Sequence, residues 1–172
     1  MTEFIAYTDG SYDMDSHYGA SAIVLMDKDE RQVIYEKASA RLVIPSEEKQ
    51  QFAKEQELAA CYMAVANVPE GSRLTIKSDS QYCVKVLSGQ WNASANIGII
   101  DKYFSLVRRR KVDVAFVKVR GHSGARGGQA IWGNDRADEL CTAACEQLKN
   151  YGVKTIVSRQ DNPLLPPSQE SV

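Results

Sequence analysis

This sequence lacks the features that mark secreted, membrane and highly charged proteins. It has no long hydrophobic run and no basic N-terminal stretch, so we expect no signal peptide, no membrane anchor and a cytoplasmic location. The chain also has no large excess of positive or negative charge, because 21 Lys and Arg residues nearly balance 22 Asp and Glu residues. A general positive field for attracting polyanions is therefore excluded. A local basic patch is not, since salt screens exposed charges beyond about 10 Å.

Cysteine patterns for metal binding are missing as well. Cys61, Cys83, Cys141 and Cys145 lack the paired spacing of a zinc site and have no accompanying histidine cluster, which favours buried free thiols. The 172 residues, 44% of them hydrophobic, suffice for one compact domain. We place this domain at residues 1–150 and expect residues 151–172 to form a tail that is disordered in part.

The hydrophobic periodicity predicts a mixed α/β fold. The predicted strands are residues 4–8, 19–26, 32–37, 74–77 and 112–119, and the predicted helices are about 46–66, 81–87, 94–110 and 134–149. Short connections join the first three strands, which favours an antiparallel meander, and the later strands alternate with helices. We therefore predict a five-stranded mixed sheet with helices on both faces.

Four acidic residues occupy positions where a lone carboxylate is costly. Asp9 and Asp79 end predicted strands, Glu57 borders the apolar stripe of a helix, and Asp138 lies in the first turns of the last helix. Each alone has an ordinary alternative role, as a turn residue, an N-cap or a solvated helix residue. Together at one sheet edge they would repel one another, and a pair of Mg²⁺ ions, with Mn²⁺ as an alternative, would relieve that repulsion.

The ligand type also predicts the chemistry. Two hard cations roughly 3.5–4 Å apart activate a water on one side of a phosphate and stabilise the leaving oxygen on the other. The sequence shows no Cys or Ser nucleophile with a partnered His, which argues against a covalent mechanism.

Five short strings resemble the motifs of the type I ribonuclease H family. They are Thr8-Asp9-Gly10-Ser11, Gln56-Glu57-Leu58-Ala59-Ala60, Ser78-Asp79-Ser80-Gln81-Tyr82, Val119-Arg120-Gly121-His122-Ser123-Gly124 and Asn134-Asp135-Arg136-Ala137-Asp138-Glu139-Leu140. They occur in the family's order over residues 4–148, and together they are far more specific than any one alone. The resemblance implies a ribonuclease H-like fold. It also implies hydrolysis of the RNA strand in RNA–DNA hybrids, with 5′-phosphate and 3′-hydroxyl products.

The resemblance further implies roles for single residues. Asp9 would bridge both metal ions, Glu57 and Asp79 would hold one ion, and Asp138 would hold the other. His122 would assist proton transfer or product departure; the alternative is an ordinary surface-loop histidine. The candidate contacts to the hybrid, including its 2′-hydroxyl groups, are Gly10, Ser11, Gln81 and Asn134. Gln81 is equally well interpreted as a helix-start residue.

The chain departs from the family pattern in three places. Phe52-Ala53-Lys54 replaces a Thr-Asn-Asn-type run, so Lys54 is a candidate phosphate contact in place of those amides. The segment between His122 and Asp138 is longer than usual, and we interpret its Trp132 as an anchor for that loop in preference to a stacking residue. The stretch 88–111 is too short for a full basic handle, and packing is the preferred interpretation of its Trp91.

A basic stretch precedes the histidine string. Arg108, Arg109 and Arg110 either contact substrate phosphates or form a solvated helix face, and phosphate contacts would make binding strongly salt-dependent. We expect a monomer that binds hybrid and no membrane. Two rival functions are a DNA-cutting nuclease on the same fold and a binding module that has lost activity. The presence of all four acids argues against the binding module.

Overall fold

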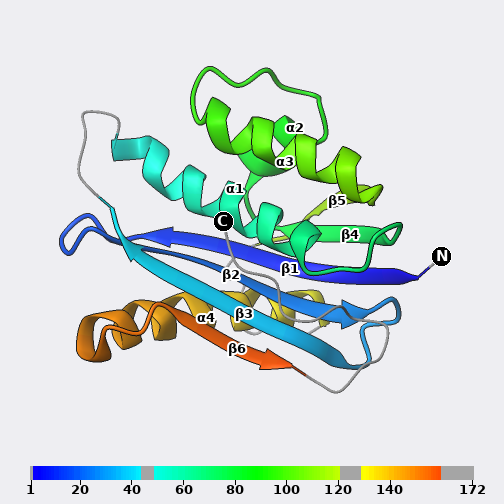
Figure 1. Cartoon of the computed structure of the whole chain (residues 1–172). Helices are drawn as coiled ribbons and strands as arrows, with labels where there is room; N and C mark the ends of the chain where they lie inside the picture. Colours follow the sequence, from blue (N-terminus) through cyan, green and yellow to red (C-terminus); the bar gives the residue numbers. More distant parts are fainter. Residues whose placement is uncertain (1, 44–48, 121–128, 160–172) are drawn as a thin grey trace.

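The computed structural model describes residues 2–43, 49–120 and 129–159. Within these ranges the strands are β1 (Glu3–Tyr12), β2 (Tyr18–Asp27), β3 (Val33–Leu42), β4 (Arg73–Ser78), β5 (Asp113–Lys118) and β6 (Thr155–Arg159). The helices are α1 (Lys49–Ala66), α2 (Gln81–Leu87), α3 (Ile97–Arg110) and α4 (Gln129–Tyr151). The strands form one sheet in the order β5-β4-β1-β2-β3-β6, with α1, α2 and α3 on one face and α4 on the other (Figure 1). The predicted mixed fold with helices on both faces is confirmed.

Strand β1 runs through the middle of the sheet and sets its mixed character. It pairs antiparallel with β2 and parallel with β4. The parallel register places Thr8 opposite Ser78, so the residues that follow them, Asp9 and Asp79, lie at the same edge of the sheet. This register is the main reason that two acids far apart in sequence meet.

The predicted turn at the first acid is wrong. Strand β1 continues past Asp9 to Tyr12, because Gly10 pairs with Ser21 and the neighbouring residues continue the ladder with β2. Asp9 therefore lies inside a strand with its backbone held on the β2 side, and a local turn signal has been overridden by tertiary pairing.

The predicted strand count is one short. Strand β6 pairs antiparallel with β3, with Ser39 opposite Thr155 and Tyr35 opposite Arg159. It falls within the segment expected to be a partly disordered tail. Its five residues are too short for a clear periodic pattern, and the partner strand lies more than a hundred residues earlier.

Two apolar layers hold the helices on the sheet. Leu58 and Tyr103, from α1 and α3, belong to the core on the first face. On the second face, small residues such as Ala22, Ala38 and Ala137 let α4 lie close to the strands. Three of the four cysteines are buried and all are free, as expected. No helix in the described ranges is long and apolar enough to cross a membrane.

Candidate metal and catalytic site

Three carboxylates meet at the edge of the sheet where β1 and β4 bring their acids together. Asp9, Glu57 and Asp79 each offer one oxygen, and these oxygens all lie within 4.8 Å of one another. Asp9 comes from β1, Asp79 directly follows β4, and Glu57 projects from the middle of α1. The structure thus brings together three of the four predicted acids as one compact group of oxygen ligands.

The close approach of α1 to β1 depends on Gly10. A Cβ added at this position would lie 2.2 Å from the backbone nitrogen of Glu57, so no larger residue fits without movement of the helix. Next to it on β2, the Ser21 hydroxyl donates a hydrogen bond of 2.7 Å to the Gln56 carbonyl. The turn of α1 that carries Glu57 is therefore seated directly on β1 and β2.

Burial and mutual repulsion make Asp9 the most perturbed of these acids. Burial, followed by repulsion from Asp79, Asp138 and Glu57, raises the pKa of Asp9 to about 8, although the Gly10 N–H opposes the shift. Burial also raises the pKa of Glu57. A set of buried acids with raised pKa values fits a divalent cation, which would compensate their negative charge.

Asp138 stands beside this group on α4. It repels Asp9 electrostatically, but it is not one of the acids whose oxygens lie within 4.8 Å of one another. Helix α4 begins at Gln129 and not at Asn134, so the prediction that Asp138 lies in the first turns is wrong. The helix is held close to β1 at Gly133, where a Cβ would lie 2.2 Å from the Tyr7 ring.

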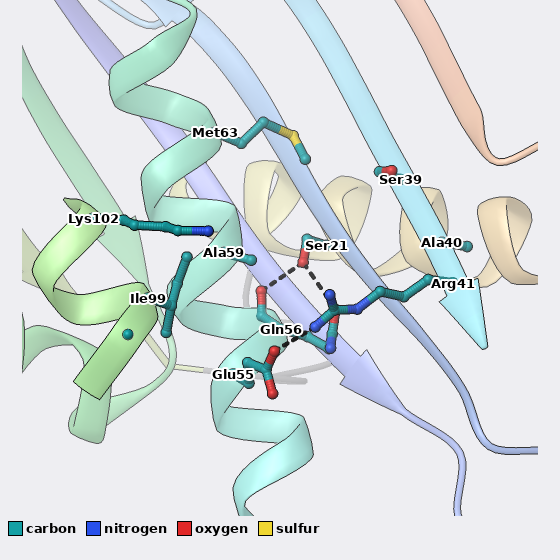
Figure 2. Close-up of a pocket in the computed structure, with 11 residues that line it drawn as sticks. Ser21, Ser39, Ala40, Arg41, Glu55, Gln56, Ala59, Met63, Ile99 and Lys102 are labelled. Atoms are coloured by element: carbon teal, nitrogen blue, oxygen red, sulfur yellow. Dashed lines mark hydrogen bonds and ion pairs between the residues drawn. The ribbon is translucent and has the colours of Figure 1, made fainter. Parts of the chain in front are cut away.

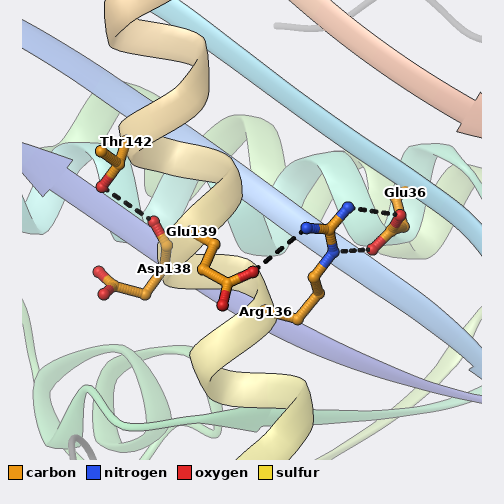
Figure 3. Close-up of polar contacts among 5 residues, drawn as sticks. All are labelled: Glu36, Arg136, Asp138, Glu139 and Thr142. Carbon is orange, nitrogen blue, oxygen red and sulfur yellow. Dashed lines mark hydrogen bonds and ion pairs between the residues drawn. The ribbon is translucent and has the colours of Figure 1, made fainter.

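Arg136 anchors the same part of α4 without neutralising Asp138. Its Nε donates a 2.7 Å hydrogen bond to Glu36 of β3, and its Nη1 lies 3.2 Å from Glu139. Figure 3 shows the Asp138 carboxylate pointing away from this ion-pair group, on the other side of the helix. The negative charge of Asp138 is therefore left available for a cation.

Asn134 is buried and contacts one of the acids. It is 2% exposed, and its Nδ2 donates a long hydrogen bond of 3.5 Å to Asp79. Because Asn134 and Asp138 are four residues apart on α4, they share one helix face, which the contact to Asp79 places toward the carboxylates. The structure thus connects this predicted substrate contact to an acid.

Ser80 is a site residue that the sequence interpretation missed. Its hydroxyl accepts a 3.2 Å hydrogen bond from the Cys83 N–H as the N-cap of α2. The same side chain hydrogen-bonds the Glu57 carboxylate and lowers its pKa, in opposition to burial. The string Ser78-Asp79-Ser80 predicts the cap, but only the tertiary structure shows the bond to α1.

Comparison with known proteins agrees with this arrangement. A family model described as RNase H matches residues 1–146. The chain belongs to the RNase H family. The protein named Ribonuclease H from Methylorubrum extorquens strain PA1 is 30% identical over 128 residues, which cover 66% of this chain and 53% of that protein. The chain thus spans about half the length of this relative.

Two solved structures share the RNase H fold. The N-terminal RNase H domain of a Mycobacterium tuberculosis protein, solved as a fusion with maltose-binding protein, has a TM-score of 0.64 and 15% identity over 89% of this chain and 100% of that chain. The LC11 RNase H1, isolated from compost by a metagenomic approach, has a TM-score of 0.65 and 18% identity over 87% and 100%.

Four of the predicted substrate contacts of this RNase H family member lie close to the acids along the chain or act on one electrostatically. Gln81 is exposed at the start of α2, and Gly10 and Ser11 follow Asp9 along β1. The Lys54 ammonium lies 4.7 Å from the centre of the Tyr82 ring, and it lowers the pKa of Glu57. Lys54 is thus close enough to the acids to act electrostatically on Glu57.

The basic last turn of α3 lies at the other end of the sheet. Arg110 ties this end of α3 to the fold: its side-chain Nη2 donates to the Val68 carbonyl at 2.6 Å, and its backbone carbonyl accepts from the Gly71 N–H at 2.9 Å. Strand β5 begins there and ends at Lys118, opposite Ser78. Five strand steps of roughly 3.3 Å put about 16 Å between the two ends. The structure does not bring Arg108, Arg109 and Arg110 to the carboxylates.

The remaining predicted residues have separate outcomes. His122 lies outside the described residues. Trp132 belongs to α4 and not to a loop, and it shares a helix face with Arg136 on the side away from Asp138. Trp132 and Trp91 are 44% and 47% exposed, so neither ring is buried as a packing role would require.

Proposed function

We propose that this protein is an endoribonuclease that hydrolyses the RNA strand of RNA–DNA hybrids. The observation that carries the proposal is the convergence of Asp9, Glu57 and Asp79 within 4.8 Å, with Asp138 close enough to raise the pKa of Asp9. Membership of the RNase H family supports the choice of substrate. The expected products carry 5′-phosphate and 3′-hydroxyl ends.

The four acids are suited to hold a pair of Mg²⁺ ions, with Mn²⁺ as an alternative of the same ligand preference. Asp9 would serve both ions, Glu57 and Asp79 one of them, and Asp138 the other. When bound, such ions lower the pKa of an attacking water and stabilise charge on the leaving oxygen.

The protein's own groups position these acids and the substrate. Ser80 orients Glu57, and Asn134 donates to Asp79. Gly10, Ser11 and Gln81 are proposed to contact the 2′-hydroxyl side of the hybrid, which distinguishes RNA from DNA. Lys54 is proposed to attract a backbone phosphate, and His122 to take or release a proton near neutral pH.

The test is cleavage of an end-labelled RNA–DNA hybrid by the full chain, with Mg²⁺ and with chelator, followed on a denaturing gel. Cleavage of the RNA strand that requires Mg²⁺ and disappears in Asp79→Asn is expected. Asp29→Asn is a suitable control, because Asp29 is exposed in the turn between β2 and β3. Phosphatase treatment and ligation of the products would identify their end groups.

Parallel assays separate the rival functions. Cleavage of duplex DNA without cleavage of the hybrid would make the protein a DNA nuclease. Hybrid binding without turnover, together with no Mg²⁺ binding by calorimetry, would make it a binding module. The protein is proposed to act as a monomer, which light scattering on the eluted protein would test.

A further inference from the structure

A second cavity lies beside α1, apart from the carboxylate group. Its volume is about 230 Å³. Ser21 and Ser39 contribute from the sheet, Gln56 and Met63 from α1, and Lys102 from the first turns of α3 (Figure 2). None of the four predicted acids lines it.

The cavity contains a buried amide that lacks a partner. Gln56 is 3% exposed, and its Nε2 makes no hydrogen bond to any described residue. The Ser21 hydroxyl donates to the Gln56 carbonyl and lies 3.5 Å from Oε1, so it leaves the amide N–H groups unused. A buried donor without an acceptor costs about 1–3 kcal/mol, and an acceptor brought by a ligand would recover that cost.

The charges around the cavity favour an anion. Arg41 and Glu55 pair with each other at 2.5 Å, and Figure 2 shows the Arg41 guanidinium beside the Gln56 amide. Lys102 is exposed, and its ammonium has no carboxylate within 4 Å among the described residues. The lining therefore carries one uncompensated positive charge and one unused amide donor.

The remaining lining limits the size and shape of an occupant. Ala59, Met63 and Ile99 form an apolar wall on the α1 and α3 side. A volume of about 230 Å³ holds roughly seven or eight waters at about 30 Å³ each, which is the space of one compact organic molecule.

We propose that this cavity is a binding site for a small organic oxyanion, with a carboxylate or monophosphate head and a compact apolar body. The head would accept from the Gln56 amide beside the Arg41 guanidinium, which stays paired with Glu55, and Lys102 would supply the uncompensated positive charge. The apolar body would lie against Met63 and Ile99. Because Gln56 precedes Glu57 on α1, an occupant would contact the helix turn that carries a catalytic acid. The proposal does not depend on the nuclease activity.

The experiment is a titration of the ¹⁵N-labelled full chain, followed by NMR. The probes are benzoate and phenyl phosphate, with neutral benzamide and inorganic phosphate as controls for charge and for the apolar body. Saturable shifts are expected at the Gln56 side-chain amide and at Ile99 with at least one of the two oxyanion probes. The comparison of benzoate with phenyl phosphate identifies the preferred head group. Benzamide and inorganic phosphate should bind at least about tenfold more weakly, since each lacks one part of the recognition.

Two variants test the assigned contacts. Gln56→Met keeps the length of the side chain and removes the amide, and Lys102→Met removes the charge; each should weaken the better probe by about tenfold. Lys28→Met, at an exposed lysine of the turn between β2 and β3, should leave binding unchanged. Because Lys102 is exposed, Lys102→Met should fold, and its binding can be measured even if Gln56→Met fails to fold. Absence of saturation at about 20 mM of either oxyanion, or equal binding by Lys102→Met, would overturn the proposal.

Discussion

At the scale of single residues, Asp9 is an acid at which burial and repulsion between carboxylates combine. Its side chain is buried on β1, and three other carboxylates surround it. Its pKa of about 8 means that the metal-free site holds a proton there at neutral pH. The residues proposed to bind a metal ion are thus also residues that destabilise the protein without one.

The first prediction concerns the pH dependence of stability. Asp9 has a pKa of about 8 in the folded protein, against about 3.9 in an unfolded chain. Between these values the folded state binds more protons, so the stability of the metal-free protein should fall as pH rises from about 4 to about 8. Asp9→Asn should flatten this decline and raise the melting temperature near pH 8 in chelator.

Calorimetry with and without Mg²⁺ checks this prediction. Mg²⁺ should stabilise the wild-type protein at pH 8 and have much less effect on Asp9→Asn. If Asp9→Asn lowered the melting temperature at pH 8 in chelator, and the variant still cleaved hybrid with Mg²⁺, the site would have to lie elsewhere.

The second prediction concerns the contact between β1 and α1. Gly10→Ala places a Cβ at 2.2 Å from the Glu57 backbone nitrogen, so it should destabilise the protein by about 1–3 kcal/mol or more and weaken Mg²⁺ binding. Gly98→Ala is the matched control, because nothing lies within 4 Å of a Cβ there. Since Gly98 is in helix α3, that change should stabilise the protein by up to about 1 kcal/mol. Equal unfolding midpoints in urea for the two variants would contradict the close approach.

At the scale of elements, the acids are positioned by contacts between helices and strands. The N-cap of α2 reaches Glu57 of α1 through Ser80, and α4 rests on β1 where Gly133 meets the Tyr7 ring. Each of these contacts joins two elements that are not consecutive in the sequence. The geometry of the carboxylates therefore depends on how the elements pack as well as on the local conformation of each one.

The third prediction tests the connection through Ser80. Ser80→Ala removes an N-cap, which should cost about 1 kcal/mol of stability, and it also removes the donor that lowers the pKa of Glu57. The pKa of Glu57 should therefore rise further, and Mg²⁺ binding measured by calorimetry should weaken. Ser105→Ala, on the exposed face of α3, is the control and should change neither quantity appreciably. Unchanged Mg²⁺ affinity in Ser80→Ala would remove Ser80 from the site.

At the scale of the whole molecule, positive charge is divided between the two ends of β5. The basic last turn of α3 lies where β5 begins, and Lys118 ends β5 beside the strand that leads to Asp79. A formal net charge of −1 leaves no general attraction for a polyanion, so binding must depend on where individual cations lie.

The fourth prediction follows from this distribution. Lys118→Gln should weaken hybrid binding several-fold. It should also reduce the slope of the logarithm of the binding constant against the logarithm of salt concentration by about one, as expected for the loss of one phosphate contact. Arg109→Gln should change affinity less than about twofold, because its end of α3 is about 16 Å from the acids. Binding titrations at several salt concentrations with a chelator present would check both. A larger effect of Arg109→Gln would mean that the hybrid extends over the far end of the sheet.

Much of the fold and site was open to prediction from the sequence because the relevant signals are local. The periodicity of residues 81–87 predicts α2 with its bounds, and the short motif strings point to all four acids. The positions of Asp9 to Tyr12 in β1 and of Thr155 to Arg159 in β6 were missed. In both places pairing with a distant strand, and not the local residues, produces the extended conformation.

The sequence alone determined most of the elements, the identity of the acids and the family, since each of these is encoded by residues close together along the chain. Only the tertiary structure decided that Gly10 lets α1 touch β1, that Ser80 holds Glu57 and that Arg110 is tied to Val68. These are contacts between residues remote in sequence. Their distances depend on how the layers pack, which no short stretch of the chain specifies.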